Sequence, residues 1–323
     1  MIVRIIKYLL IIMLMLVTIV LAIVFIVPMT FDPDELPLNY AKVDSKLYLG
    51  KGKNQPLLVY FGGSEGGNSM TKPHKVKHRE QYTNQGYAML AIGYFGMVGT
   101  PEEVDRISLN AIHDEIVEAM NNPSIDSNCV AVMGGSKGAE LALTLASKYS
   151  DIKGAVAFAG SHVVFASPSI YTDGMASSFM LNDKQLPSVP LTPEIIPTLI
   201  LEGFREAHEV ALEDTLAVDK ARIEVEEING PILLISGEKD HIWPSKEMSD
   251  EVINRLKSKG FSYPVQHIVV PNGNHFQPQS DYHPQTIEFL NMNLLPACER
   301  NQSKISYKPF KRALCFKEVY GYR

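Results

Sequence analysis

The stretch from Cys129 to Tyr149 constrains the fold of this chain more than any other part. Its apolar start, Cys129 to Met133, predicts a short buried strand, and a helical pattern of apolar residues follows the turn Gly-Gly-Ser-Lys-Gly centred on Ser136. A serine between a strand end and a helix start is held in strained backbone geometry, with the helix amides aimed at its hydroxyl. The G-x-S-x-G pattern therefore predicts a nucleophilic Ser136. The alternative is a glycine-rich turn of another kind of α/β domain, such as a phosphate-binding one.

Buried-strand patterns alternate with helical patterns along the rest of the chain. Strands are expected at residues 57–61, 87–94, 129–133, 154–159, 231–235 and 265–270, with an edge strand or two near 41–49. Helices are expected at residues 101–120, after Ser136, at 245–259 and at 283–294. This rhythm predicts an α/β fold with a doubly wound, mostly parallel sheet that is covered on both faces.

One long interruption separates the strand that ends at Ala159 from the strand that starts at Pro231. It is too long for a connecting loop, and it contains a helical piece at residues 194–211. We therefore expect an inserted cap at about residues 162–226.

The residues expected to activate Ser136 lie on two later loops. A serine hydroxyl needs a base to take its proton, and the base needs an acid to fix its tautomer. In a doubly wound sheet such groups follow the carboxyl ends of strands, and Asp240 and His275 occupy those positions. The order Ser, Asp, His along the chain is that of α/β-hydrolases. Glu238 is a rival acid, and Asp240 has the alternative role of capping the next helix.

An oxyanion hole needs two backbone amides near the nucleophile. One is expected from Lys137, the residue after Ser136, and one from the glycine-rich loop after the strand at 57–61. Gly63 is the first choice in that loop and Ser64 the second. A plain turn at the end of the strand is the alternative.

The N-terminal segment predicts a membrane anchor. Residues 9–27 are apolar at every position but Thr18, which is long enough to cross a hydrocarbon core of about 30 Å. Arg4 and Lys7 precede this segment and three acidic residues follow it at positions 32–35. This asymmetry predicts a single-pass protein with a cytoplasmic N-terminus and the catalytic domain on the outer side. The alternative is a signal peptide whose cleavage yields a secreted protein.

Charge and cysteine content narrow the remaining functions. A net charge of −6 over 323 residues gives no basic surface of the kind that nucleic acids require. Cys129 is expected as a buried small hydrophobe, whereas Cys298 and Cys315 are candidates to pair in an oxidising compartment. We expect no metal and no cofactor, since cysteine spacings typical of metal sites are absent from the sequence.

A basic cluster at residues 72–79 has two interpretations. It includes His74 and His78, which have helical spacing but no carboxylate partner suited to a metal site. A solvated loop is the first interpretation. The alternative is a contact with the phosphates of a coenzyme A substrate or with anionic lipid headgroups.

Five segments together resemble one family, that of the acyl-CoA thioesterases and bile acid-CoA:amino acid N-acyltransferases, in its C-terminal hydrolase domain. They are Gly62-Gly63, residues 86–96, the G-x-S-K-G turn, the run Gly237 to Asp240 followed by Trp243, and Gly273-Asn274-His275. The resemblance covers about residues 57–279. The chain departs from the family in having an apolar segment and a linker where members usually carry a β-sandwich domain.

The resemblance implies that Ser136, Asp240 and His275 are nucleophile, acid and base of an acyl-CoA thioester hydrolase. Serine at position 136 favours hydrolysis, because the acyltransferase branch uses cysteine. A carboxylesterase, an N-acyltransferase and an inactive membrane-tethered binding protein remain as alternatives. The expected organisation is an anchor at 1–28, a linker with edge strands at 29–55, the hydrolase domain at 56–297 and a tail at 298–323.

Overall fold

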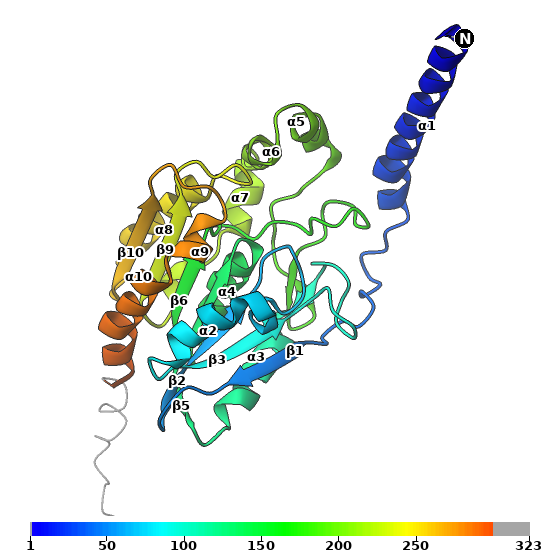
Figure 1. The fold of residues 1–323 in the computed structure, drawn as a ribbon. Coiled ribbons are helices and arrows are strands. Elements are labelled where there is room, and N and C mark those ends of the chain that lie inside the picture. The colour runs from blue at the N-terminus through cyan, green and yellow to red at the C-terminus, as the bar shows by residue number, and fades with distance from the viewer. Residues whose placement is uncertain (1, 300–323) are drawn as a thin grey trace, which may run out of the picture.

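The computed structural model describes residues 2–299, and a seven-stranded sheet forms its centre (Figure 1). Its strands are β1 (Asp44–Tyr48), β2 (Gln55–Phe61), β3 (Ala88–Gly93), β5 (Ile125–Gly135), β6 (Ile152–Phe158), β9 (Ile232–Gly237) and β10 (Val265–Val270). They lie in the order β1-β3-β2-β5-β6-β9-β10. Only β1 runs antiparallel to its neighbour in this sheet. The predicted doubly wound, mostly parallel sheet is therefore confirmed.

Alternating side chains of the strands build one apolar core on each face of the sheet. Leu57, Val59 and Phe61 of β2 pack into the core beneath α3 (Leu109–Met120), α4 (Lys137–Lys148) and α8 (Ser245–Ser258). Leu58 and Tyr60 pack into the opposite core, beneath α2 (Val76–Thr83) and α10 (His283–Phe289). Burial on both faces explains why the strands are almost continuously apolar.

The strand order reverses at β2, and this places the site. The chain runs from β2 to β3 on one side and returns to β5 on the other. Loops that follow β2 and β5 therefore diverge from a common crevice at the carboxyl end of the sheet, which is where doubly wound folds bind ligands. The first of these loops contains Gly63 and the second contains Ser136.

The long segment between β6 and β9 has its own elements. We call residues 162–226 the cap segment; it includes β7 (Phe179–Leu181), β8 (Lys184–Gln185), α5 (Ile196–Leu201), α6 (Phe204–Ala211) and α7 (Thr215–Ala221). Its two strands join β4 (Ile107–Ser108) in a small second sheet. The helix predicted at 194–211 is divided by Gly203, whose φ of 132° an L-residue rarely adopts. Short helical turns complete the described chain: η1 (Ser69–Thr71), η2 (Pro73–Lys75), η3 (Pro193–Ile195), η4 (Val225–Glu227), α9 (Gln277–Asp281) and η5 (Leu290–Leu294).

The N-terminal helix α1 (Ile2–Met29) projects away from the domain (Figure 1). Within the described residues it alone is long and apolar enough to cross a membrane, with the candidate span at Arg4–Ala22. A signal sequence would pass the same test of length and composition.

Three sequence-based expectations are wrong, one about a helix start and two about cysteines. The helix predicted at 101–120 begins only at Leu109, where the Ser108 hydroxyl accepts a hydrogen bond from the Ala111 amide at 3.2 Å, so Glu102 and Glu103 lie outside its first turn. Cys129 is buried as expected, but it forms a disulfide with Cys298, whose Cα lies 5.3 Å away.

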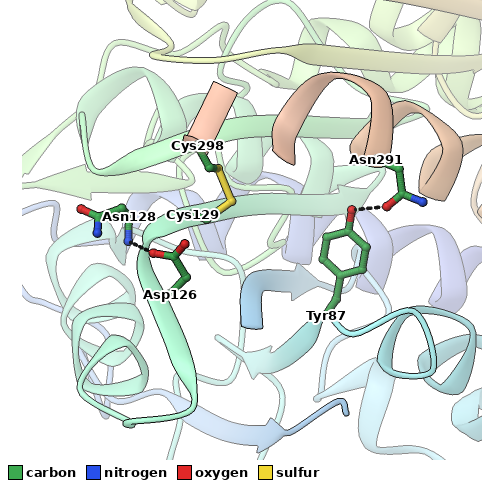
Figure 2. Close-up of a disulfide and its surroundings, with 6 residues drawn as sticks. All are labelled: Tyr87, Asp126, Asn128, Cys129, Asn291 and Cys298. Carbon is green, nitrogen blue, oxygen red and sulfur yellow. Dashed lines mark hydrogen bonds between the residues drawn. A yellow bond between two sulfur atoms is a disulfide. The ribbon is translucent and has the colours of Figure 1, made fainter. Parts of the chain in front are cut away.

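The disulfide fastens the C-terminal helical segment to β5, the strand that leads to Ser136 (Figure 2). Cys129 lies in β5, and Cys298 follows η5. A second tie nearby is the Tyr87 hydroxyl, which donates to Oδ1 of Asn291 at 2.7 Å. Pairing between Cys298 and Cys315 is therefore wrong, and Cys315 lies outside the described residues.

Candidate active site

Ser136 stands at the turn between β5 and α4 with φ 55° and ψ −123°. A backbone in this region costs a residue with a Cβ about 1–3 kcal/mol, and such strain persists where the surroundings impose it. The turn is imposed by close packing: a Cβ at Gly138 would collide with the carbonyl oxygens of Phe61 and Gly62. The predicted strand, sharp turn and helix around Ser136 are thus present.

His275 and Asp240 meet on neighbouring loops. Nδ1 of His275 lies 3.0 and 2.8 Å from the two carboxylate oxygens of Asp240, and both residues are buried. The loops approach closely because Gly237 has no Cβ; one there would collide with the carbonyl oxygens of Gly273 and Asn274. Parallel pairing of β9 with β10 brings the two loop starts side by side.

Further donors fix the Asp240 carboxylate. The Ser245 hydroxyl donates to Oδ2 at 2.6 Å, and the amide of Ile242 donates to Oδ1 at 2.9 Å. Burial alone would raise the pKa of Asp240, but the hydrogen bond and charge of His275, together with these two donors, outweigh it and lower the pKa. Asp240 is therefore held as a carboxylate that orients the His275 ring.

The rival acid points elsewhere. The Glu238 carboxylate accepts a hydrogen bond from the Asn272 amide at 2.7 Å, at the exposed side of the same loop. Among the described residues, Asp240 alone forms an ion pair with His275.

Gly63 lies against Ser136. A Cβ at Gly63 would be 3.1 Å from both the Ser136 Cβ and the Gly135 carbonyl oxygen. The buried Tyr94 hydroxyl donates to the Gly62 carbonyl oxygen at 2.9 Å and so fixes the peptide before Gly63. Ser64, the second choice, is exposed.

The Lys137 side chain turns into the protein. Its Nζ lies 3.0 Å from both carboxylate oxygens of Glu140, and both side chains are almost completely buried. Oε1 of Glu140 also accepts from the Phe165 amide at 3.1 Å, which ties α4 to the cap segment. Burial lowers the pKa of Lys137 and raises that of Glu140, while their mutual attraction opposes both shifts.

Ser136 and His275 are brought to the same edge of the sheet without being hydrogen-bonded. Within residues 2–299, no hydrogen bond joins the Ser136 hydroxyl to the His275 ring. The loop of His275 nevertheless packs on the nucleophile turn, since a Cβ at Gly135 would collide with the side chain of Gln279. In unliganded hydrolases such catalytic hydrogen bonds are often long and tighten when substrate binds.

The basic cluster at 72–79 is partly structural. The Arg79 guanidinium lies over the Tyr48 ring, 3.8 Å from its centroid, and donates to the Met70 carbonyl oxygen. In the described part of the chain, no three His, Cys, Asp or Glu side chains gather as a metal site would require.

Several site residues escaped sequence reasoning. Arg205 of α6 donates to the Asp240 carbonyl oxygen at 3.0 Å, and the Trp243 ring lies 6.0 Å from that of His275. The Lys137–Glu140 pair had a visible signal, an acid three residues after a lysine on an otherwise apolar helix face. Arg205 and Tyr94 had none, because their partners lie far away in sequence.

Comparison with known proteins relates the chain to one protein family. A family model described as "BAAT / Acyl-CoA thioester hydrolase C terminal" matches residues 114–294. Mouse acyl-coenzyme A thioesterase 5 is 24% identical over 246 residues, which cover 75% of this chain and 54% of that protein. Mouse bile acid-CoA:amino acid N-acyltransferase is 24% identical over 249 residues, which cover 73% and 54%. The chain thus spans about half the length of these relatives.

Solved structures agree on the fold. The Pyrococcus horikoshii acylaminoacyl peptidase matches with a TM-score of 0.52 at 15% identity, covering 77% of this chain and 39% of that one. A puromycin-hydrolyzing peptidase of Mycobacterium tuberculosis matches with a TM-score of 0.52 at 14% identity, covering 76% and 36%. The fold is that of the α/β-hydrolases. Since the family model matches more than half of its residues, the chain belongs to the BAAT / acyl-CoA thioester hydrolase C-terminal family.

Proposed function

We propose that this chain is a serine hydrolase that cleaves acyl thioesters or acyl esters at Ser136. The observation that carries the proposal is the buried pair of His275 and Asp240 on loops beside the strained Ser136 turn. Family membership supports thioester chemistry, since the relatives are acyl-coenzyme A thioesterases by name.

The chemistry follows from the roles that the geometry allows. His275 removes the proton from the Ser136 hydroxyl as the oxygen attacks the acyl carbonyl carbon, and it then protonates the leaving thiolate or alkoxide. Asp240 holds the ring in the required tautomer through Nδ1. The amides of Gly63 and Lys137 stabilise the negative oxygen of the tetrahedral intermediate. Water, activated by His275, releases the acid from the acyl-enzyme.

Replacing Ser136 tests this proposal. The full chain in detergent is assayed against acyl-CoAs of several lengths and against simple esters, with Ser136→Ala as the variant. We expect the variant to keep its fold and to lose at least about 10³-fold in kcat, because the members of a triad act as a unit. Ser262→Ala, the same exchange at an exposed serine just before β10, is the matched control. Hydrolysis retained by Ser136→Ala would contradict the assignment.

The same protein preparation tests two further functions, acyl transfer to an amine and binding without catalysis. Similarity to an N-acyltransferase favours a test with glycine or taurine present, in which an amide product would indicate transfer. Labelling of Ser136 by a fluorophosphonate distinguishes an active hydrolase from a binding protein that kept the fold. The panel of substrates also decides between coenzyme A and another leaving group.

We further propose that α1 anchors the chain as a single-pass protein, with a cytoplasmic N-terminus and the hydrolase domain outside. Arg4 and Lys7, which precede the apolar residues 9–27 at the N-terminal end of α1, support this orientation. The Cys129–Cys298 disulfide supports it independently, because disulfides persist mainly in oxidising compartments. In this proposal the anchor, linker, hydrolase domain and tail keep the boundaries expected from the sequence, and the cap segment covers the site.

A further inference from the structure

An apolar cavity lies inside the cap segment. Its volume is about 230 Å³, which exceeds the roughly 150 Å³ of an apolar cavity able to hold benzene. Its polar lining residues are Ser167, Ser169, Thr172, Asp173 and His208, and its apolar lining includes Ile170, Leu191, Ile195, Ile196, Leu199 and Phe204. These apolar side chains suit an aliphatic tail, because they offer contact without hydrogen bonds.

The mouth of this cavity is bordered by exposed apolar side chains. Ile170 and Phe204 line it while remaining 61% and 56% exposed. Ile200 and Leu201 lie between the lining residues Leu199 and Phe204 in sequence, and they are 70% and 81% exposed. Together with Tyr171, these five exposed residues form what we call the apolar rim. An exposed apolar cluster of this kind marks an interaction site.

The linker after α1 is fixed beside the loop that carries Tyr171 of the rim. The buried Arg106 guanidinium donates to the carbonyl oxygens of Pro33 and Glu35 at 2.9 and 2.8 Å, and it lies 4.8 Å from the centroid of the Phe31 ring. A groove farther along the linker is lined by Leu38 on one side and Tyr171 of the rim on the other. The linker that follows α1 is therefore held next to Tyr171 of the apolar rim.

The positions of α1 and of the cap helices in space agree with this proximity of the linker and the rim. The cap helices α5 and α6 project from the domain on the side from which α1 also leaves it (Figure 1). A bilayer crossed by α1 would therefore meet α5 and α6, which carry Ile200, Leu201 and Phe204 of the rim, before α7.

We propose that the apolar rim docks into the bilayer that α1 spans, and that the cavity takes the aliphatic tail of a membrane-resident acyl ester or thioester directly from it. This inference rests on the proposed anchor and the proposed hydrolase. It names the substrate class as amphiphiles that reside in the membrane rather than molecules free in solution.

Aromatic contacts connect the wall of the cavity to His275. His208 lines the cavity, and its ring centroid lies 5.8 Å from that of Trp243. Trp243 in turn contacts His275, with ring centroids 6.0 Å apart. The wall that His208 forms is therefore the side of the cavity that lies toward His275, with the Trp243 ring between them.

Charge identifies the kind of bilayer surface. Glu202 and Glu206 adjoin the rim, while the neighbouring Arg205 is engaged by Glu209 at 2.9 Å and Glu247 at 3.2 Å. The rim therefore carries no free basic group that would attract anionic lipids. It suits a zwitterionic surface, into which apolar side chains insert without electrostatic help.

Docking is measured by quenching in nanodiscs. The full chain with Cys315→Ser and Leu201→Cys is labelled with a fluorescent dye and reconstituted into zwitterionic nanodiscs that contain doxyl-labelled lipid. We expect strong quenching at Leu201 and none at Met292→Cys, another exposed apolar position, on η5. Equal or absent quenching at Leu201 overturns the docking, as does a chain that does not stay with the nanodiscs. Quenching that needs anionic lipid overturns the choice of surface.

Delivery of the tail is measured with two esters that share one leaving group. p-Nitrophenyl acetate is soluble, whereas p-nitrophenyl palmitate resides in the nanodisc. The double variant Ile200→Ser, Leu201→Ser should lose at least about tenfold in palmitate hydrolysis, since two buried apolar side chains are lost from the docked state, and keep acetate hydrolysis. Met292→Ser should keep both.

The outcomes separate this inference from the proposed function. Unchanged palmitate hydrolysis in the rim variant overturns the inference alone. Acetate hydrolysis that survives Ser136→Ala, or that the unaltered chain lacks, overturns the proposed function, and the quenching experiment still decides the docking.

Discussion

At the scale of single residues, the buried pair of Lys137 and Glu140 links the nucleophile turn to the cap. The Lys137 backbone amide is a proposed oxyanion donor, and its side chain is locked by Glu140, which also holds the Phe165 amide of the cap segment. A buried pair of this kind is weak evidence for stability in itself, but removing one partner leaves a charge without compensation. Its role is therefore to position the peptide that follows Ser136.

We expect Lys137→Met to lower the free energy of unfolding by about 3–5 kcal/mol and to lower kcat more than it alters KM. The double variant Lys137→Met, Glu140→Leu should recover part of the stability, since no charge is left unpaired, but not the full kcat. Urea unfolding and steady-state kinetics measure the two effects. Lys148→Met removes the more exposed ion pair with Glu224 and should cost no more than about 1 kcal/mol. A double variant with full kcat would exclude the positioning role.

The buried His283 should make the stability of the fold sensitive to acid. It is buried beside the Tyr82 hydroxyl, 2.8 Å from Nδ1, and burial together with the charges of His78 and Lys75 lowers its pKa to about 4. The unfolded chain binds this proton near pH 6.5 and the folded chain only near pH 4. The contribution of His283 to the free energy of unfolding is therefore complete above about pH 6.5, and it is lost as the pH falls toward 4.

From about pH 7.5 to about pH 5, this one histidine should cost about 2 kcal/mol of unfolding free energy. Urea unfolding at the two pH values measures the loss. His283→Gln removes the titration and should reduce the loss by that amount, whatever its effect at neutral pH. Burial also lowers the pKa of His162 to about 4. In the His283→Gln variant, His162 should therefore still cause a loss of unfolding free energy of similar size over this pH range. An unchanged pH dependence in His283→Gln would refute this account.

At the scale of elements, the sequence predicted what local pattern and strand direction determine. The strands of the sheet and the turn at Ser136 follow from apolar runs and glycines, and the loops of Asp240 and His275 follow from their place after parallel strands. The start of α3 was missed because residues before it are organised from a distance. Arg106 adopts a φ of 48° while it binds the linker, a contact that no local pattern contains.

Other elements depended on partners that the sequence does not reveal. The disulfide joins residues 169 positions apart, so spacing could not distinguish Cys129 from Cys315 as the partner of Cys298. The cap segment could be located by its length, but its division at Gly203 and its cavity depend on how it packs. Local patterns identify elements and the order of functional loops, whereas pairs between distant segments require the folded chain.

At the scale of the whole molecule, the anchor and the disulfide both bear on where the domain resides. Basic residues at the N-terminal end of α1 favour a cytoplasmic N-terminus, and a buried disulfide between β5 and the C-terminal segment favours an oxidising surrounding. The two features are independent, since one lies in the anchor and the other in the domain. A domain outside the cytoplasm would meet lipid-like acyl compounds more readily than a cytoplasmic acyl-CoA pool.

The thiol state in intact cells tests this conclusion. In cells quenched with acid and denatured, an alkylating reagent should modify Cys315 alone, and reduction should expose Cys129 and Cys298 as well. Cys298→Ser should release one further thiol without reduction and lower the free energy of unfolding by about 2–5 kcal/mol, as expected for a crosslink that closes a long loop. Three free thiols before reduction would instead place the domain in a reducing compartment. The orientation inferred from Arg4 and Lys7 would then be reversed, and a cytoplasmic acyl-CoA would become the natural substrate.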